Sequence, residues 1–144
     1  MALTAPDALL AAASLHLGFQ LTVTGLAYPA LAEVPEGDWA RAHSAHGRRV
    51  TPVVALVYGL LAAACLWTLA ARPYDPLLLL AAAGAGSAAL ATALVAGPTH
   101  GRLSREGRSA ERLRTLRRAD GVRLGCALAC AAAALGHAVL EGSA

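Results

Sequence analysis

Four long apolar stretches, separated by short segments rich in proline, glycine and charge, constrain this chain more than any other feature. They cover residues 7–32, 50–71, 77–97 and 124–140. Each is close to the ~20 residues that a helix needs to cross the hydrocarbon core of a bilayer. Hydrophobic residues make up 57% of the chain and charged residues 15%, whereas soluble domains have about 45–50% and 25%. The sequence therefore predicts an all-α integral membrane protein, a four-helix bundle that forms a single domain.

The arginines predict how this bundle is oriented. All 12 basic residues are arginine, and Arg72 alone lies outside the segments that follow the first and third stretches. Because cytoplasmic segments of membrane proteins carry the excess of basic residues, we expect these two segments in the cytoplasm and both termini on the other side of the cell membrane. The lipid bilayer is then one partner. Nucleic acid is not an expected partner, because only 4% of the residues are aromatic and basic and aromatic residues do not alternate as in base-stacking surfaces.

The second and fourth helices are expected to extend beyond the apolar stretches on the cytoplasmic side. Asp38 has the chemistry of an N-cap and starts the second helix near Trp39, and the fourth helix starts near Ser109. The breaker pair at 97–98 ends the third helix. The predicted helices cover about residues 7–32, 38–71, 77–97 and 110–141. With ~1.5 Å of rise per residue in a tight hairpin, His46 lies opposite an apolar part of the first helix, so we expect its side chain in a protein-lined polar space.

Polar residues recur every four positions along the first span, at His16, Gln20, Thr24 and Tyr28. A polar stripe that faced lipid would be costly, so it is expected to face the bundle interior, where ionisable groups commonly mark function. In the second helix, Trp39, His43 and His46 share one face with apolar residues. His16 lies at about the height of Tyr58 by the same hairpin count. These two stripes are expected to line an internal pocket.

Asp120 lies on the apolar face of the fourth helix, with Arg117 and Arg123 three positions away on either side. One interpretation is an internal salt bridge with one of these arginines, since an isolated buried carboxylate needs a partner. The other is that Asp120 orients a histidine, and the two are compatible. We expect Arg49, Arg117 and Arg123 to align with the buried stripes and to stabilise negative charge that develops on oxygen.

His100 follows the third span and lies on the same side of the membrane as His43 and His46. Three imidazoles can hold a catalytic metal and leave one position open, and copper or non-haem iron suits such ligands. Haem is less favoured, because no histidine stands opposite His16 at its depth. Interfacial histidines without any cofactor are the alternative interpretation.

Small residues predict close helix packing. Residues 81–89 of the third span are all alanine, glycine or serine, and the fourth span has Gly121, Gly125 and Ala129 at a spacing of four. Such faces let helix backbones approach in lipid, within the bundle or between copies in a homo-oligomer. A general alanine-rich bias would give the same pattern.

Three short runs resemble a known group. Residues 26–29 (LAYP), 39–46 (WARAHSAH) and 98–103 (PTHGRL) are similar to those of small four-span bacterial membrane proteins of the anthrone-oxygenase-like family. Asp120 and Gly121 stand where that family has an Asn-Trp pair before the arginine of the last helix. The resemblance implies oxidative chemistry on a lipophilic aromatic or polyketide-like molecule.

These observations favour a membrane-embedded enzyme, a metal-dependent oxidoreductase or oxygenase that acts on a lipophilic small molecule. The expected catalytic residues are His43, His46, Arg49 and Asp120, and the expected metal ligands are His43, His46 and His100. The expected substrate contacts are His16, Gln20, Tyr28, Trp39, Tyr58, Arg117 and Arg123. A small-molecule or proton-coupled transporter is the second hypothesis, and a structural or assembly protein is the third.

Overall fold

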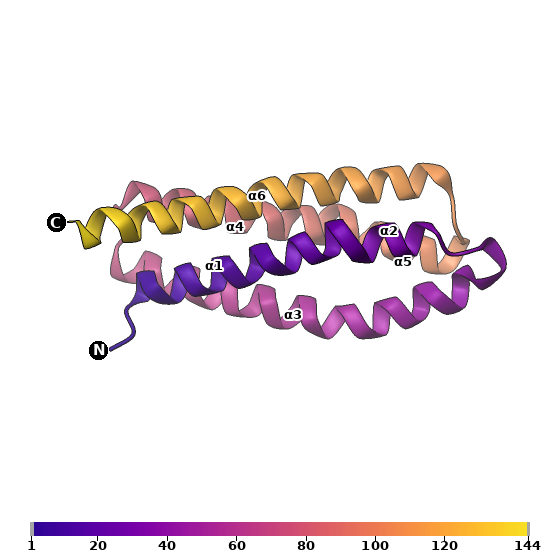
Figure 1. The fold of residues 1–144 in the computed structure, drawn as a ribbon, viewed down its shortest axis with the longest axis horizontal. Coiled ribbons are helices and arrows are strands. Elements are labelled where there is room, and N and C mark those ends of the chain that lie inside the picture. Colours follow the sequence, from indigo (N-terminus) through magenta and orange to yellow (C-terminus); the bar gives the residue numbers. More distant parts are fainter. Residues whose placement is uncertain (1, 144) are drawn as a thin grey trace.

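The computed structural model describes residues 2–143, and every regular element in that range is helical. Four helical rods lie side by side along one long axis (Figure 1). Both termini lie at one end of the bundle, which we call the terminal end. The other end, which we call the arginine-rich end, carries the connections near residues 33–38 and 107–109. All four rods are long and apolar enough to cross a membrane. The predicted all-α membrane bundle is therefore confirmed.

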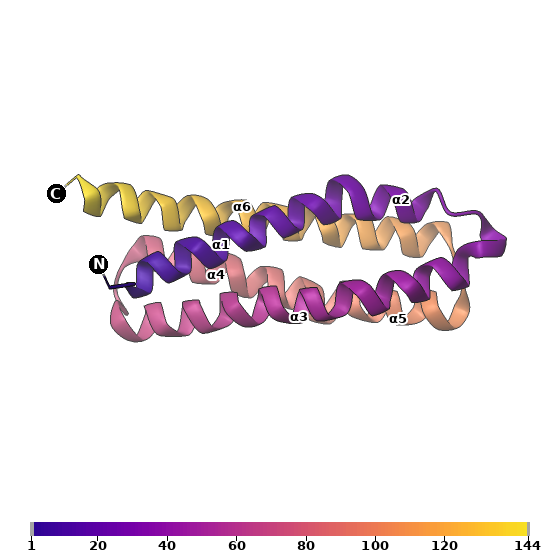
Figure 2. The same ribbon diagram turned by 60° about the horizontal axis from the view of Figure 1, so that its bottom comes forward.

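Each rod is one helix or a stack of helical segments. The first consists of α1 (Ala5–Thr22), the π-helical turn η1 (Val23–Ala27) and α2 (Tyr28–Ala32). The second consists of the short 3-10 turn η2 (Glu36–Asp38) and α3 (Trp39–Ala71). The third consists of α4 (Pro76–Ala91), the π-helical turn η3 (Thr92–Ala96) and α5 (Gly97–Glu106), and the fourth is α6 (Ala110–Gly142). Figure 2 shows the same order with the lower side turned forward.

Three of the helix starts have side-chain caps. The Thr4 hydroxyl accepts from the backbone N–H of Asp7, whose carboxylate accepts in return from the backbone N–H of Thr4. The Asp75 carboxylate accepts from two backbone N–H groups of α4, and Ser109 caps α6 as predicted. Such caps stabilise a helix by about 1 kcal/mol. The helix that starts at Trp39 is also confirmed, but Asp38 makes no side-chain cap there.

The prediction that the third helix ends at Gly97 is wrong, because the rod continues through α5 to Glu106. The physical reason is the π turn. The N–H of Gly97 donates to the carbonyl oxygen of Thr92, five residues back, and Pro98 then takes an early position of the next α-helical segment, where its missing N–H costs little. The first rod repeats this arrangement, with Pro29 as the second residue after η1. The third helix thus extends at the arginine-rich end along with the second and fourth.

The half of the bundle nearer the terminal end is a dry core. Leu9, Leu61, Leu78 and Cys130 come from the four rods and are buried together there with small alanines. α4 and α6 pack most closely: a Cβ built on Gly84 would lie 2.9 Å from the carbonyl oxygen of Cys126. One face of the small residues of the third span, with Ala81, Gly84, Ala85 and Ala88, therefore packs inside the bundle, and the opposite face is exposed.

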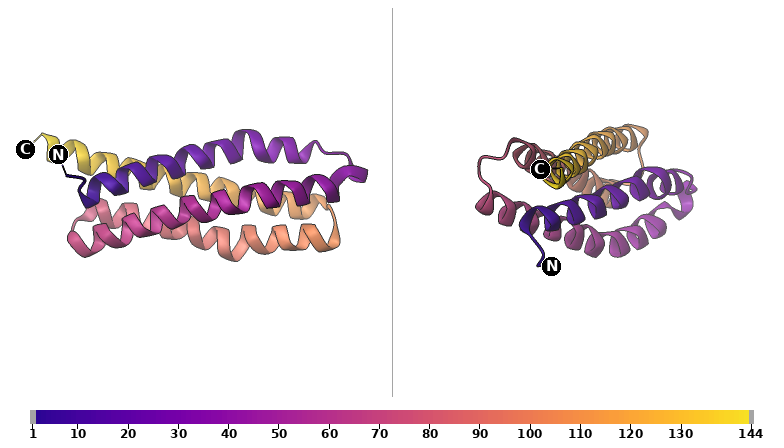
Figure 3. Two further views of the ribbon diagram at one scale, coloured as in Figure 1. Left: turned by 90° about the horizontal axis from the view of Figure 1, so that it is seen from below. Right: turned by 60° about the vertical axis from the view of Figure 1, so that its left-hand side comes forward.

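The small residues of the fourth span lie elsewhere. Gly121, Gly125 and Ala129 are exposed, and a Cβ built on either glycine would meet nothing within 4 Å. This spacing is thus not used for packing within one copy of the chain. Figure 3 shows α6, coloured orange to yellow, running from one end of the bundle to the other.

Polar contacts join the helices to one another at each end of the bundle. At the arginine-rich end, Arg108 donates to the carbonyl oxygens of Val34 and Ala32 at 2.7 and 2.8 Å and lies over the Trp39 ring. At the terminal end, His137 contacts the Asp75 carboxylate at 3.1 Å. The backbone N–H of Leu78 and the neighbouring His137 hold the pKa of Asp75 below its ordinary value.

Candidate functional site

A cavity of 590 Å³ lies in the half of the bundle nearer the arginine-rich end. Its two long walls are α3 on one side and η3 with α5 on the other, which run side by side in Figures 2 and 3. Phe19, Val23, Tyr28 and Arg123 complete the lining. Both π turns contribute residues to it, and π turns in α-helices are frequently found at functional sites. The volume suits a small organic molecule.

A pair of histidines faces this cavity. His43 of α3 and His100 of α5 bring Nε2 and Nδ1 to 3.1 Å, which is a hydrogen bond. The Oγ of Ser104 lies 3.3 Å from the other ring nitrogen of His43. His46, one turn along α3, stacks on His100 with ring centroids 6.0 Å apart. The structure therefore brings together the three histidines that the sequence groups.

A buried polar cluster lies beside the histidine pair. Arg123 Nη2 donates to Asp120 Oδ1 and to the Tyr28 hydroxyl, both at 2.9 Å. Gln20 Nε2 also donates to Asp120 Oδ1. Asp120 is 3% exposed and Arg123 is 5% exposed, so the ion pair is removed from solvent. The predicted internal salt bridge is confirmed, and Arg123 is the partner.

The cluster and the histidine pair are joined through Tyr28, whose hydroxyl lies 3.3 Å from His100 Nε2. Arg123 can only donate, so the Tyr28 oxygen accepts from it and its hydrogen points to His100. His100 then carries its proton on Nδ1 and donates to His43, which in turn donates from Nδ1 to Ser104. These tautomers follow from the hydrogen-bond partners. The result is one directed chain from Arg123 to the exposed Ser104.

Other predicted substrate contacts lie around this site. His16 is fully buried and meets Tyr58 edge to face, with centroids 4.9 Å apart. The Tyr58 hydroxyl lies 2.9 Å from the Thr92 hydroxyl in η3. Trp39 stacks on His43 at 5.1 Å and is 3% exposed, so it fixes the imidazole from the side away from the cavity lining.

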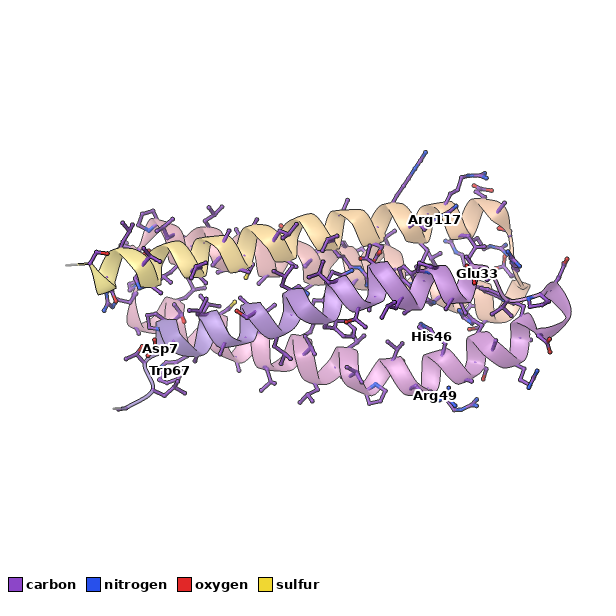
Figure 4. All side chains as sticks on the ribbon, in the orientation of Figure 1. Asp7, Glu33, His46, Arg49, Trp67 and Arg117 are labelled. Carbon is purple, nitrogen blue, oxygen red and sulfur yellow. The ribbon has the colours of Figure 1, made fainter. Side chains whose placement is uncertain are left out.

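The expectation that Arg49 and Arg117 align with the buried stripes is wrong, because both are exposed. Figure 4 shows both side chains directed away from the bundle, whereas His46 points into it. The free energy of hydration keeps an unpaired arginine in solvent where its helix allows it. Asp120 has its cation in Arg123, and no buried anion faces Arg49 or Arg117 among the described hydrogen bonds and salt bridges of residues 2–143. Arg117 instead lines a separate hollow of 390 Å³ with two further arginines, Arg108 and Arg114.

The fit of the site to a metal ion is partial. Within residues 2–143, no group of three or more His, Cys, Asp or Glu side chains is arranged to hold an ion. Two imidazoles on one ion, with bonds of ~2.0–2.1 Å, have their nitrogens about 2.9–3.4 Å apart for angles of about 90–109°. The 3.1 Å between His43 and His100 lies within that range. His46 would need its ring to turn from the stack before it could become a third ligand.

Sequence reasoning missed Ser104 and Thr92. Ser104 lies four positions after His100 on α5, a helix face that was not considered because residues 97–109 were expected to form a connection. Thr92 gives no sign in the sequence of its contact with Tyr58, which depends on the π turn that contains it.

No family model, curated protein or solved structure matches the chain. A function is therefore argued from the geometry of the cavity and its polar residues.

Proposed function

We propose that the protein is a membrane-embedded enzyme, an oxidoreductase that binds a lipophilic small molecule in the cavity between α3 and α5. The observation that carries the proposal is the hydrogen-bonded pair of His43 and His100 in the cavity wall, coupled through Tyr28 to a buried arginine. A mostly apolar cavity with a few convergent polar groups is typical of a small-molecule site. An aromatic or polyketide-like ligand, as the family resemblance implies, fits this lining.

Each polar residue has a distinct role in this proposal. His43 and His100 exchange a proton with the bound molecule, since an imidazole nitrogen can accept or donate a proton. Arg123 lines the cavity and stabilises negative charge that develops on a substrate oxygen. Asp120 is a positioning residue, because it binds Arg123 and does not line the cavity, and Gln20 in turn donates to Asp120.

The oxidoreductase takes one of two forms. In the first, His43 and His100 hold a copper or non-haem iron ion, with His46 as a third ligand after its ring turns, and the metal supplies the redox chemistry. In the second, no metal is bound, the histidines remove and return protons, and molecular oxygen is the oxidant that accepts the electrons of the substrate. The 3.1 Å between the two ring nitrogens fits both forms. Haem is less favoured, because His16 packs against Tyr58 and has no second histidine opposite it.

Two features favour an enzyme over the other hypotheses. The dry core around Leu9, Leu61 and Leu78 fills the terminal half of the bundle, whereas a transporter needs access from both sides. A structural protein would have no use for a buried ion pair such as Asp120 and Arg123, which is costly to place in a membrane. The arginine-rich end faces the cytoplasm in this proposal, by the positive-inside rule, and the cavity is reached from that side of the cell membrane.

The test begins with protein purified in lipid nanodiscs. Elemental analysis and an absorption spectrum distinguish copper, iron, haem and a cofactor-free protein. Mass spectrometry of organic extracts then compares cells that express the protein with cells that express H43A, H100A or the control R49Q. We expect the amount of a lipophilic compound to differ between the extracts. Cells with the parent protein or R49Q should share one level, and cells with H43A or H100A should share another. The proposal fails if all four extracts are the same and the purified protein holds neither metal nor lipophilic ligand.

A further inference from the structure

Several buried polar atoms have no hydrogen-bond partner among residues 2–143, and most of them belong to the first rod or to Arg123, which Asp120 and Gln20 connect to that rod. The group comprises His16 Nδ1 and Nε2, Gln20 Oε1, Thr24 Oγ1 and Arg123 Nε. His16 and Gln20 have no exposed surface. Leaving such groups unpaired costs about 1–3 kcal/mol each, and lipid offers no water to satisfy them. A concentration of five such atoms calls for a polar occupant.

The chemistry of two of these atoms is fixed by their neighbours. Gln20 must turn its amide nitrogen to the Asp120 carboxylate, because its oxygen would be repelled there. Gln20 Oε1 is therefore a free acceptor. Arg123 Nε carries a hydrogen and can only donate. Since Gln20 and Arg123 both bind Asp120 Oδ1, one acceptor and one donor are left without partners in neighbouring side chains.

One member of this group, Arg123, lines the cavity. The other members lie next to residues that line it: Phe19 precedes Gln20, Val23 precedes Thr24, and Thr92 contacts the Tyr58 hydroxyl beside His16. Beyond His16 along α1, the dry core begins at Ala13 and Leu9. The unpaired atoms thus mark the place where the polar part of the bundle ends.

We infer that His16, Gln20, Thr24 and Arg123 form a polar subsite for a neutral hydroxyl group. A hydroxyl has one hydrogen to donate and lone pairs to accept, so its chemistry matches both the free acceptor of Gln20 and the free donor of Arg123. A carbonyl cannot donate, a carboxylate would face Gln20 Oε1 and Asp120, and a cation would face Arg123. The hydroxyl comes either from water or from a hydroxyl-bearing lipophilic substrate, and the second source rests on the proposed function.

Binding of a matched pair of probes tests the second source. 4-Propylphenol and propylbenzene differ by one hydroxyl, and each is titrated into nanodiscs with protein and into lipid-only nanodiscs to correct for partitioning. Trp39, stacked on His43, reports binding by fluorescence in a W67F background, because Trp67 is exposed at the other end of α3. We expect the phenol to bind at least tenfold more tightly, since a hydrogen bond to a charged group has that magnitude.

Two variants connect this preference to the subsite. Q20M keeps the length of the side chain and removes the acceptor, and H16F keeps the edge-to-face contact with Tyr58 and removes both nitrogens. Each is expected to reduce the preference to less than threefold. T22V, at an exposed position of the same helix, is the matched control and is expected to keep it. Thermal unfolding confirms that each variant is folded, and two different variants ensure that one misfolded protein does not decide the result.

Magnetisation transfer from water to ¹⁵N-labelled imidazoles tests the first source. Transfer to the His16 ring nitrogens, with no preference for the phenol, supports the subsite with water as its occupant. The subsite is overturned if no transfer from water reaches the His16 nitrogens and the protein shows no preference for the phenol. It is also overturned if the protein prefers the phenol and the Q20M and H16F variants keep that preference. If both probes bind equally and no transfer from water reaches the His16 nitrogens, the cavity stands without this subsite. If neither probe binds, the proposed function loses its cavity, while the water measurement still decides the subsite.

Discussion

The close approach of α4 and α6 gives a stability prediction with an internal control. A Cβ on Gly84 would lie 2.9 Å from the carbonyl oxygen of Cys126 and 3.1 Å from the backbone nitrogen of Cys130. Both are backbone atoms, so the helices must separate to accept an alanine. Gly86, on the same helix, has nothing within 4 Å of its Cβ position. The substitutions G84A and G86A therefore differ in packing and little else.

The magnitude follows from two opposing effects. Replacing glycine by alanine within a helix stabilises it by about 1 kcal/mol, and this gain is common to both variants. Overpacking a tight contact costs about 1–3 kcal/mol, and this loss applies to G84A alone. The two variants are thus expected to differ by about 1–3 kcal/mol. For a protein of this size, that corresponds to a difference in Tm of about 2–12 °C.

Thermal unfolding in one detergent, followed by circular dichroism, measures this difference. We expect G86A to unfold at or above the Tm of the parent protein and G84A to unfold below G86A. Equal Tm values for the two variants would refute the close packing of α4 on α6, and a G84A protein that is more stable than G86A would do so more strongly.

Three further predictions concern other contacts. R123M leaves the buried Asp120 carboxylate without its cation and is expected to lower the free energy of unfolding by about 3–5 kcal/mol. The double variant D120L/R123M is expected to recover part of that loss. A double variant that recovers none of the loss would contradict the pairing of Asp120 with Arg123. The backbone N–H of Leu78 holds the pKa of Asp75 below its ordinary value of 3.8, so this carboxylate stabilises the fold above pH 3.8 and ceases to do so as the pH falls through its lowered pKa. D75N should therefore lose less Tm than the parent protein between pH 5 and pH 2, as measured by circular dichroism, and equal losses would count against the shift. If the exposed face at Gly125 joins two copies of the chain, G125L abolishes dimers detected by cross-linking in nanodiscs, whereas an unchanged cross-linking pattern assigns that face to lipid.

The sequence predicted the polar faces well, because they depend on helical spacing alone. His16, Gln20 and Tyr28 are separated by multiples of four positions and are all buried. The three histidines at the arginine-rich end also come together, because hairpin geometry fixes their height and helix periodicity fixes the face of His43.

The choice among the arginines could not be predicted. Arg117 and Arg123 are both three positions from Asp120, so spacing along one helix does not distinguish them. The distinction comes from the first rod, where Tyr28 accepts from Arg123. The continuation of the third helix was also hidden, since Pro98 is as typical of a helix end as of a position after a π turn.

The two π turns make the site sensitive to the number of residues in a helix as well as to their identity. Each turn holds one residue more than an α-helical path would. Eight positions of a regular α-helix would place Tyr28 about 80° around the axis from Gln20, and the extra residue of η1 offsets this rotation. The same holds for Thr92 and His100 across η3. In an alignment of related chains, one residue could therefore be deleted from either turn without turning the site residues to another face, whereas a deletion in the α-helical residues beside a turn would rotate them by about 100°.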